Sequence, residues 1–214
     1  MPITLNGSGT VSGISAGGLP DGIIQSADLA TGVGGKLLQV VTTNITSTSS
    51  VAFGSYSLAA STPVTATITS TAANSKFIVS CCTNGESSLE DHETHFVLRR
   101  IIGGSGTSIH VGDTAGVRPT VSAIKSLGYY ANDQDSTPSG THVGPYLDSP
   151  SQAAGTAITY GMFAMGRGAA GTFYYGRTVS TSEAGPYERL PNNMLIMEIA
   201  VSYTHLRAHE TKRN

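Results

Sequence analysis

Polar and apolar residues alternate over short stretches in most of the chain. In residues 63–70, PVTATITS, valine, alanine and isoleucine fall on one face and three threonines fall on the other. This period of two predicts a half-buried antiparallel strand. The same pattern, punctuated by turn sequences rich in glycine, asparagine, serine and proline, predicts further strands at residues 37–42, 51–58, 76–83, 95–102, 108–111, 120–129, 142–147, 157–164, 171–175 and 193–200.

Many short strands with no helical segments between them predict an all-β fold, an antiparallel β-sandwich or jelly-roll-like head. The GGSG sequence at residues 103–106 and the NGES sequence at residues 84–87 are predicted turns. The final run, MLIMEIA, is apolar on both faces apart from Glu198, so we expect it in the centre of a sheet or against a neighbouring subunit. A buried carboxylate needs a partner, and Arg99 and Arg100 are the candidates for Glu198.

The first 35 residues have a different character, because they are rich in glycine, serine and threonine and contain no basic residue. They have too few large apolar side chains to offset the entropy of ordering so much glycine. This segment is therefore predicted to be disordered, or to gain order by packing against copies of itself or another protein. One short helix is predicted at residues 26–33, with Ser26 as its N-cap. The apolar residues Ile23, Ile24 and Leu29 have no local partner, which suggests a homotrimer with these residues at the interface.

Composition and charge narrow the set of partners. The chain has 214 residues, enough for one sandwich and an extension, and only 12% of them are charged. Serine and threonine together make up about a quarter of the residues, well above average usage. With a net charge of −2 and no cluster of Lys or Arg, neither nucleic acid binding nor membrane insertion is predicted. Neutral glycans or proteins are the expected ligands, and no signal peptide is recognised at the start MPITLNGSGT.

The last residues are treated apart from the fold. VSYTHLRAHET, residues 201–211, reads as the in-frame translation of a transposon-based sequencing adapter, so we expect the pair His205 and His209 to have no metal role. The predicted organisation is therefore a stem, attachment and trimerisation segment at residues 1–35, a β-sandwich head at residues 36–200, and a non-native tail at residues 201–214.

No catalytic residue, cofactor or metal site is predicted. The stretch LEDHETH crowds Asp91, His92, Glu93 and His95, but paired histidines without a distant third ligand favour a polar turn entering a strand. The alternative is an ion held by His95 side chains that converge on a trimer axis. The adjacent Cys81 and Cys82 on one strand point to opposite faces, so free thiols are predicted.

Tyrosines near loop ends are the better candidates for ligand recognition, because they stack on sugar rings and also form hydrogen bonds. The candidates are Tyr129, Tyr130, Tyr146, Tyr160, Tyr174, Tyr175 and Tyr187, although most strand tyrosines simply pack. The most irregular loop is NDQDSTPSG. The predicted receptor contacts around it are Tyr129, Tyr130, Asp133, Asp135 and His142. Exchanging residues 131–141 should alter host binding without unfolding the head.

Several sequence pieces, in their order, resemble fibre and other virion structural proteins of environmental tailed bacteriophages. They are ITLNGSGTVSGISAGGLPDGIIQSADLA, GGKLLQVV, HFVLRR, VGDTAGVRPT, GPYLDSPSQAAGTAITY, GTFYYGR and MLIMEIA. The resemblance implies a homotrimeric virion protein, made in the host cytoplasm, that joins other virion proteins through its N-terminal segment. The expected function is non-enzymatic attachment to a host-surface glycan or protein. The alternatives are an architectural decoration or spacer protein without a ligand and, third, a glycan-degrading tailspike, which would need paired carboxylates in a groove.

Overall fold

The computed structural model divides the chain into two units, residues 1–35 with 202–214 and residues 36–201. The structure describes residues 37–89, 94–125, 138–180 and 188–200, together with two short strands near the N-terminus. In the first unit, β1 (Thr4–Leu5) pairs antiparallel with β2 (Val11–Ser12). The predicted helix at residues 26–33 and the predicted trimer contacts Ile23, Ile24 and Leu29 lie outside the described residues.

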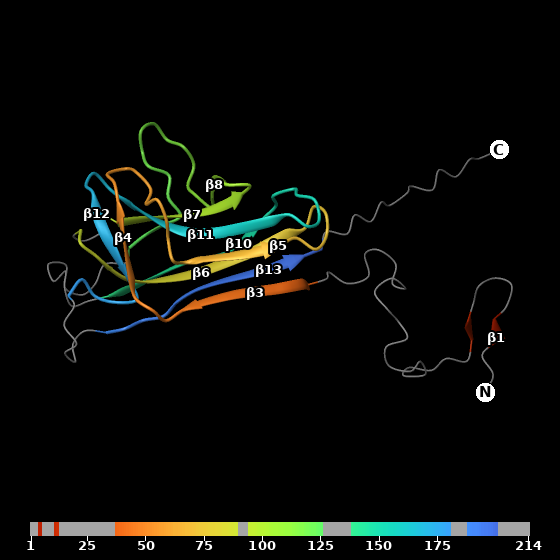
Figure 1. The fold of residues 1–214 in the computed structure, drawn as a ribbon. Helices are drawn as coiled ribbons and strands as arrows, with labels where there is room; N and C mark the ends of the chain where they lie inside the picture. Colours follow the sequence, from red (N-terminus) through yellow and green to blue (C-terminus); the bar gives the residue numbers. More distant parts are fainter. Residues whose placement is uncertain are drawn as a thin grey trace. The chain divides into compact units, whose positions relative to one another are not determined.

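The second unit is an antiparallel β-sandwich, which confirms the predicted fold class (Figure 1). One sheet has six strands, and its bounds are β3 (Leu37–Ile45), β4 (Ser49–Phe53), β6 (Lys76–Ser87), β10 (Ser139–Asp148), β12 (Gly171–Tyr175) and β13 (Asn192–Ile199). The other sheet has five strands, and its bounds are β5 (Thr65–Thr69), β7 (Thr94–Ile102), β8 (Ser105–Ile109), β9 (Ala123–Ile124) and β11 (Ala157–Gly166). No helix in the described part of the chain is long and apolar enough to cross a membrane.

Strands that are neighbours in a sheet are mostly far apart in the sequence. The six-stranded sheet follows the order β3-β13-β6-β12-β4, and β10 pairs with β6 outside this order. The five-stranded sheet follows the order β5-β11-β7-β8, and β9 also pairs with β7. The chain changes sheet at every connection from β4 to β7 and again from β9 to β12. In a jelly-roll sandwich the chain also passes repeatedly from one sheet to the other, so this head is jelly-roll-like in that respect.

The core lies between the two sheets and is filled from both sides. Phe77, Val79 and Ile196 face inward from the six-stranded sheet, and Phe96 and Leu98 face them from the other sheet. All five side chains are almost completely buried. Phe96 meets Phe173 of β12 edge-on, with 5.0 Å between the ring centroids, so aromatic packing joins the two sheets.

The predicted turn at residues 103–106 is confirmed as a two-residue hairpin loop. Ile102 pairs with Ser105, and Gly103 and Gly104 between them have φ values of 56° and 83°. Two consecutive positive φ values match the twist of the flanking strands and favour glycine at both positions. The β7–β8 hairpin therefore follows from local sequence alone.

The predicted turn at residues 84–87 is wrong, because β6 continues through it to Ser87. Gly85 pairs with Ser139 on one side and with Tyr175 on the other. A Cβ atom at Gly85 would lie 2.0 Å from the carbonyl oxygen of Tyr174. This glycine is required for a close approach between strands and not for a change of chain direction.

Candidate receptor-contact surface

The predicted contact residues divide between described and undescribed parts of the chain. Tyr129, Tyr130, Asp133 and Asp135 lie in residues 126–137, outside the described residues. The two ends of this segment are fixed, however. On one side the Lys125 N–H donates to the Thr94 carbonyl oxygen at 2.9 Å, and on the other Ser139 begins β10 opposite Gly85. We refer to residues 126–137 as the candidate loop.

His142 is described, and it lies on β10 with its side chain exposed. The strand pairing places it directly opposite Cys82 of β6, on the surface of the six-stranded sheet that faces away from the core. We call this surface the outer face. His142 Nε2 lies 3.4 Å from Cys82 Sγ, and the Oδ1 atom of Asn84 lies 3.5 Å from the same sulfur. A histidine, a thiol and an amide therefore meet on neighbouring strands.

Asn84 is held firmly in this cluster. Its Nδ2 donates to the carbonyl oxygen of Pro191, and its backbone N–H donates to Asn192 Oδ1 at 2.6 Å. A Cβ atom at Gly140, on the paired strand, would lie only 2.6 Å from Asn84 Oδ1. The absence of a side chain at Gly140 therefore leaves room for the amide oxygen to face the thiol. Neither contact was foreseen from sequence, because both depend on the register between β6, β10 and β13.

The pKa values of both thiols are raised above their ordinary value. Burial raises the pKa of Cys82, although its hydrogen bond with Asn84 acts in the opposite direction. Burial, followed by the neighbouring Cys82, raises the pKa of Cys81 to about 12. Cys81 points into the core and Cys82 toward the outer face, and both are free, as predicted. At neutral pH both remain protonated, so Cys82 is a poor nucleophile in this state.

The outer face around His142 carries several polar side chains. Pairing places Asn44 beside Asn193, Asn193 beside Cys82, and Cys82 beside His142. The term polar end is used for Asn44, Asn84, Asn193 and His142. Amide and imidazole groups both donate and accept hydrogen bonds, which suits neutral, hydroxyl-rich ligands.

The tyrosines divide by burial into packing residues and surface residues. Tyr160 and Tyr175 are fully buried, so they serve the core and cannot contact a receptor. Tyr146 and Tyr174 are half-buried, and the Arg177 guanidinium lies 4.5 Å from the centre of the Tyr174 ring. Tyr187 lies outside the described residues. Tyr56 was missed from sequence, although 59% of its surface is exposed after β4.

The expected pairing of Glu198 with Arg99 or Arg100 is wrong. Glu198 is fully buried, and its carboxylate accepts hydrogen bonds from Gln39 Nε2 at 2.6 Å and from the hydroxyl of Thr71 at 2.9 Å. Backbone N–H groups of Thr71 and Ala72 donate to it as well. The β5–β6 turn therefore wraps around this carboxylate, which accounts for a buried acid in an otherwise apolar run.

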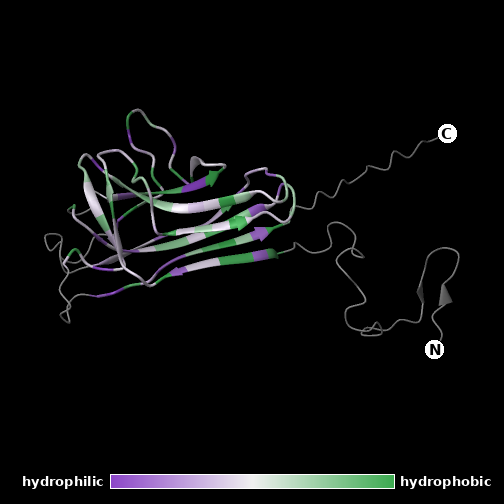
Figure 2. Cartoon of the chain, viewed as in Figure 1, coloured by the Kyte–Doolittle hydropathy of each residue, from purple (hydrophilic) through white to green (hydrophobic). Residues whose placement is uncertain are grey.

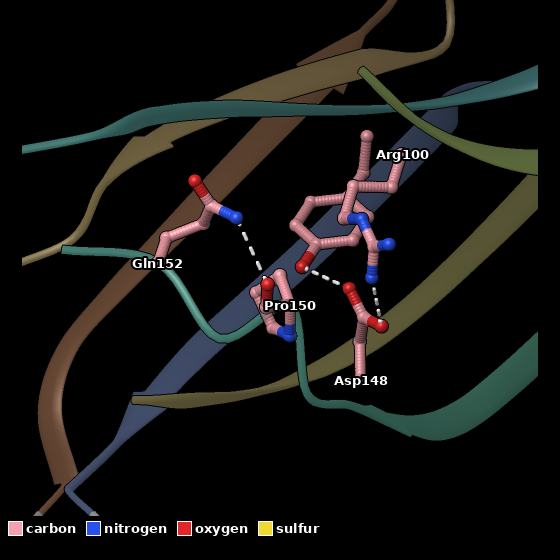
Figure 3. Close-up of polar contacts among 5 residues, drawn as sticks. Arg100, Asp148, Pro150 and Gln152 are labelled. Atoms are coloured by element: carbon pink, nitrogen blue, oxygen red, sulfur yellow. Dashed lines mark hydrogen bonds and ion pairs between the residues drawn. The ribbon is translucent and has the colours of Figure 1, made fainter. Parts of the chain in front are cut away.

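Arg100 pairs instead with Asp148 at the end of β10 (Figure 3). Its Nη1 lies 2.6 Å from Asp148 Oδ1, and the hydroxyl of Tyr160 donates to Asp148 Oδ2 at 2.7 Å. Burial raises the pKa of Tyr160, and the negative charge of Asp148 raises it further. The phenol therefore stays protonated and remains a donor. This network ties β7, β10 and β11 together across the two sheets.

The metal alternative does not gain support from the described residues. His95 is almost completely buried within the chain, so its side chain does not project toward a shared axis. Asp91, His92 and Glu93 lie outside the described residues. Across the described ranges, no three His, Cys, Asp or Glu side chains gather closely enough to hold an ion. Among these residue types, Cys82 and His142 therefore remain a contact between two groups, a buried thiol and an exposed imidazole.

Comparisons with known proteins place the chain in no family. No protein-family model matches it, and no curated protein matches it significantly. Among solved structures, it is similar to a chain described as "Structure of infectious bursal disease virus Gx strain", with 13% identity and a TM-score of 0.30. The match covers 77% of this chain, which spans 40% of the length of that chain. A likeness this weak carries no argument about function.

Proposed function

We propose that the chain is a non-enzymatic structural protein of a virion, a fibre or receptor-binding component that displays its β-sandwich head for attachment to a host-surface glycan or protein. In this proposal the N-terminal segment joins the chain to other virion proteins and to two sister copies. Three weak sites on one assembly then raise the effective affinity for a host surface.

The observation that carries the proposal is the placement of the two ends of the head. The head begins at Leu37, which pairs with Ile199 beside Lys76 at the start of β6. The candidate loop leads into β10, whose first residue, Ser139, pairs with Gly85 near the end of β6. The nine-residue step from Lys76 to Gly85 corresponds to about 30 Å along β6. The N-terminal segment and the candidate loop are thus attached at opposite ends of the sandwich, as display requires.

The surroundings of two buried acids, Asp148 and Glu198, argue against a role for them in glycoside hydrolysis. Asp148 is engaged by Arg100 and Tyr160, and Glu198 by Gln39 and Thr71. A hydrolase needs a carboxylate free to protonate or attack the glycosidic bond. These two carboxylates are instead used as hydrogen-bond acceptors that hold strands and turns together.

The test is adsorption of the full chain to host cells after exchange of the candidate loop. The earlier range of 131–141 must be shortened to 131–137, because Ser139–Asp148 form β10 and Thr141 is buried. We expect binding to fall while thermal unfolding is unchanged. A matched control replaces exposed residues 112–116, between β8 and β9, by serine and glycine.

Each outcome of this experiment separates the alternatives. Loss of adsorption only in the candidate-loop variant supports receptor binding. Absence of adsorption by the unmodified chain, with incorporation into virions, would favour the architectural spacer. Release of reducing ends from host polysaccharide by the purified chain would refute the non-enzymatic proposal.

A further inference from the structure

A row of apolar side chains crosses the outer face from one strand to the next. Val40 of β3 pairs with Met197 of β13, Met197 pairs with Ile78 of β6, and Ile78 pairs with Leu147 of β10. Directly paired residues project from the same side of a sheet, so the four side chains form one continuous line. We call Val40, Met197, Ile78 and Leu147 the apolar row.

The apolar row is open to solvent in a single chain. Val40 and Leu147, at its two ends, are each 50% exposed, and Met197 and Ile78 are half-buried. Figure 2 shows hydrophobic colouring on β3 and β13, the strands that contribute half of the row. The solvent face of an antiparallel sheet usually carries polar side chains. A contiguous apolar patch on such a face is typical of an interaction surface.

Further apolar residues extend the patch toward the beginning of β3. Ile199 lies beside Leu37, which is 56% exposed. Leu195 extends the patch in the other direction, from the apolar row toward the polar end. Among the paired residues that project from the outer face between the apolar row and this end, Lys76 carries the one formal charge. A polyanion or an acidic protein would find few positive charges to bind there. The matching partner is an equally uncharged, apolar surface.

The connection to the N-terminal segment indicates which surface that is. Thirty-six residues precede Leu37, and Leu37 itself belongs to the patch. If the N-terminal segments of several chains associate, the first residues of β3 from those chains are brought close together. The patch at this end of the outer face is then the part of each head that sister heads meet first.

We infer that the apolar row and its extension, Leu37, Leu195 and Ile199, pack against sister copies of this chain. The inference rests on the self-association included in the proposed function, and it adds the surface through which the heads take part. Burial of these side chains stabilises the assembly in addition to any contact between the N-terminal segments. The polar end of the outer face remains outside this contact.

The experiment measures the self-association of the full chain by sedimentation velocity over a dilution series. The test variants are Val40→Lys and Leu147→Lys, because side chains that are half exposed in one copy can be changed without disturbing the core. Ile124→Lys is the matched control, since Ile124 is 48% exposed but lies on β9 of the other sheet. We expect each test variant to raise the dissociation constant at least about 100-fold, with the control unchanged.

Circular dichroism and the unfolding midpoint verify that each variant remains folded. A photo-crosslinking residue at position 147 provides a second measurement, because it should yield covalent dimers or larger species, whereas the same residue at position 124 should not. The inference is overturned if the unmodified chain stays monomeric up to about 100 µM, or if Ile124→Lys dissociates it as strongly as Val40→Lys. Binding of a monomeric chain to neutral phosphatidylcholine vesicles, lost in Val40→Lys, would assign the patch to lipid instead.

Failure of this inference is distinguishable from failure of the proposed function. A chain that associates through the apolar row but does not adsorb to host cells retains the inference and refutes receptor binding. A chain that adsorbs to host cells as a monomer refutes the inference and retains receptor binding.

Discussion

Replacing Glu198 with glutamine is expected to destabilise the head strongly at neutral pH, although the two side chains have nearly the same shape. The carboxylate is completely buried. One of its oxygens accepts from Gln39 Nε2 at 2.6 Å and from the Thr71 hydroxyl at 2.9 Å, and the Thr71 N–H lies 2.9 and 3.1 Å from the two oxygens. Every one of these partners is a donor.

The size of the effect follows from the number of charged hydrogen bonds. A glutamine places an NH2 group where one oxygen stood, so at least two donors face another donor. A hydrogen bond to a charged group contributes roughly 1.5 kcal/mol or more, and two lost bonds therefore amount to about 3 kcal/mol. For a head of this size, the unfolding midpoint should fall by roughly 6–12 °C.

The effect also depends on pH. Burial alone would raise the pKa of Glu198, but hydrogen bonds from Ser75, Gln39 and Thr71 outweigh it and hold the pKa below its ordinary value. The stabilisation is therefore complete above the unfolded-state pKa of about 4.3 and is lost as the pH falls through the lower folded-state pKa. The unmodified chain should lose more stability on acidification than Glu198→Gln, so the two should converge in acid.

The assay is urea unfolding of both proteins at neutral pH and at several acidic values, read by circular dichroism. Glu188→Gln is the matched control, because Glu188 is exposed and the same chemical change there should leave stability unaltered. A loss below about 0.5 kcal/mol for Glu198→Gln at neutral pH would refute the reasoning. An equal acid dependence in the two proteins would refute the assignment of the lowered pKa.

Three further changes test other parts of the head. Asp148→Asn should cost roughly 2–4 kcal/mol in urea unfolding, because it breaks a largely buried ion pair, and unchanged stability would contradict that role. Gly85→Ala should lower the unfolding midpoint sharply through its clash with a backbone carbonyl, whereas Gly112→Ala, with open space around it, should be nearly neutral. Under native conditions iodoacetamide should modify Cys82 before Cys81, as followed by peptide mass spectrometry, and the opposite order would place the two thiols wrongly.

The strands could be predicted from sequence because their signal is local. Alternation in PVTATITS identifies β5 without knowledge of its partners, and Gly103 and Gly104 identify the β7–β8 turn. Other glycines mislead for the same reason. Gly85 looks like part of a turn, but its role is to admit the carbonyl of Tyr174 from a strand almost ninety positions away. A local pattern cannot separate a glycine needed for a turn from one needed for close approach.

Side-chain partners were harder to predict because they depend on topology. The apolar character of MLIMEIA indicated a central strand, and β13 does lie between β3 and β6. The partner of Glu198 could not be inferred, because β3 and the β5–β6 turn meet it from positions more than 120 residues earlier. The contact between Cys82 and His142 likewise requires the register of β6 with β10. Charge and residue type alone suggested an arginine where neutral donors are found.

In the proposed function, the change from apolar to polar side chains along the outer face lets self-association and ligand recognition use the same sheet without competing. Ile78, in the apolar row, and Asn84, at the polar end, are six residues apart on β6, which corresponds to about 20 Å along an extended strand. A contact with sister copies at the first position leaves the second open. Because the candidate loop joins β10 beside the polar end, each copy in an assembly would present one loop and one polar end at the end of the head opposite Leu37. Substitutions at Asn84 or Asn193 should therefore change ligand binding without changing the oligomeric state, whereas substitutions at Val40 should change the oligomeric state first and binding only through the loss of avidity.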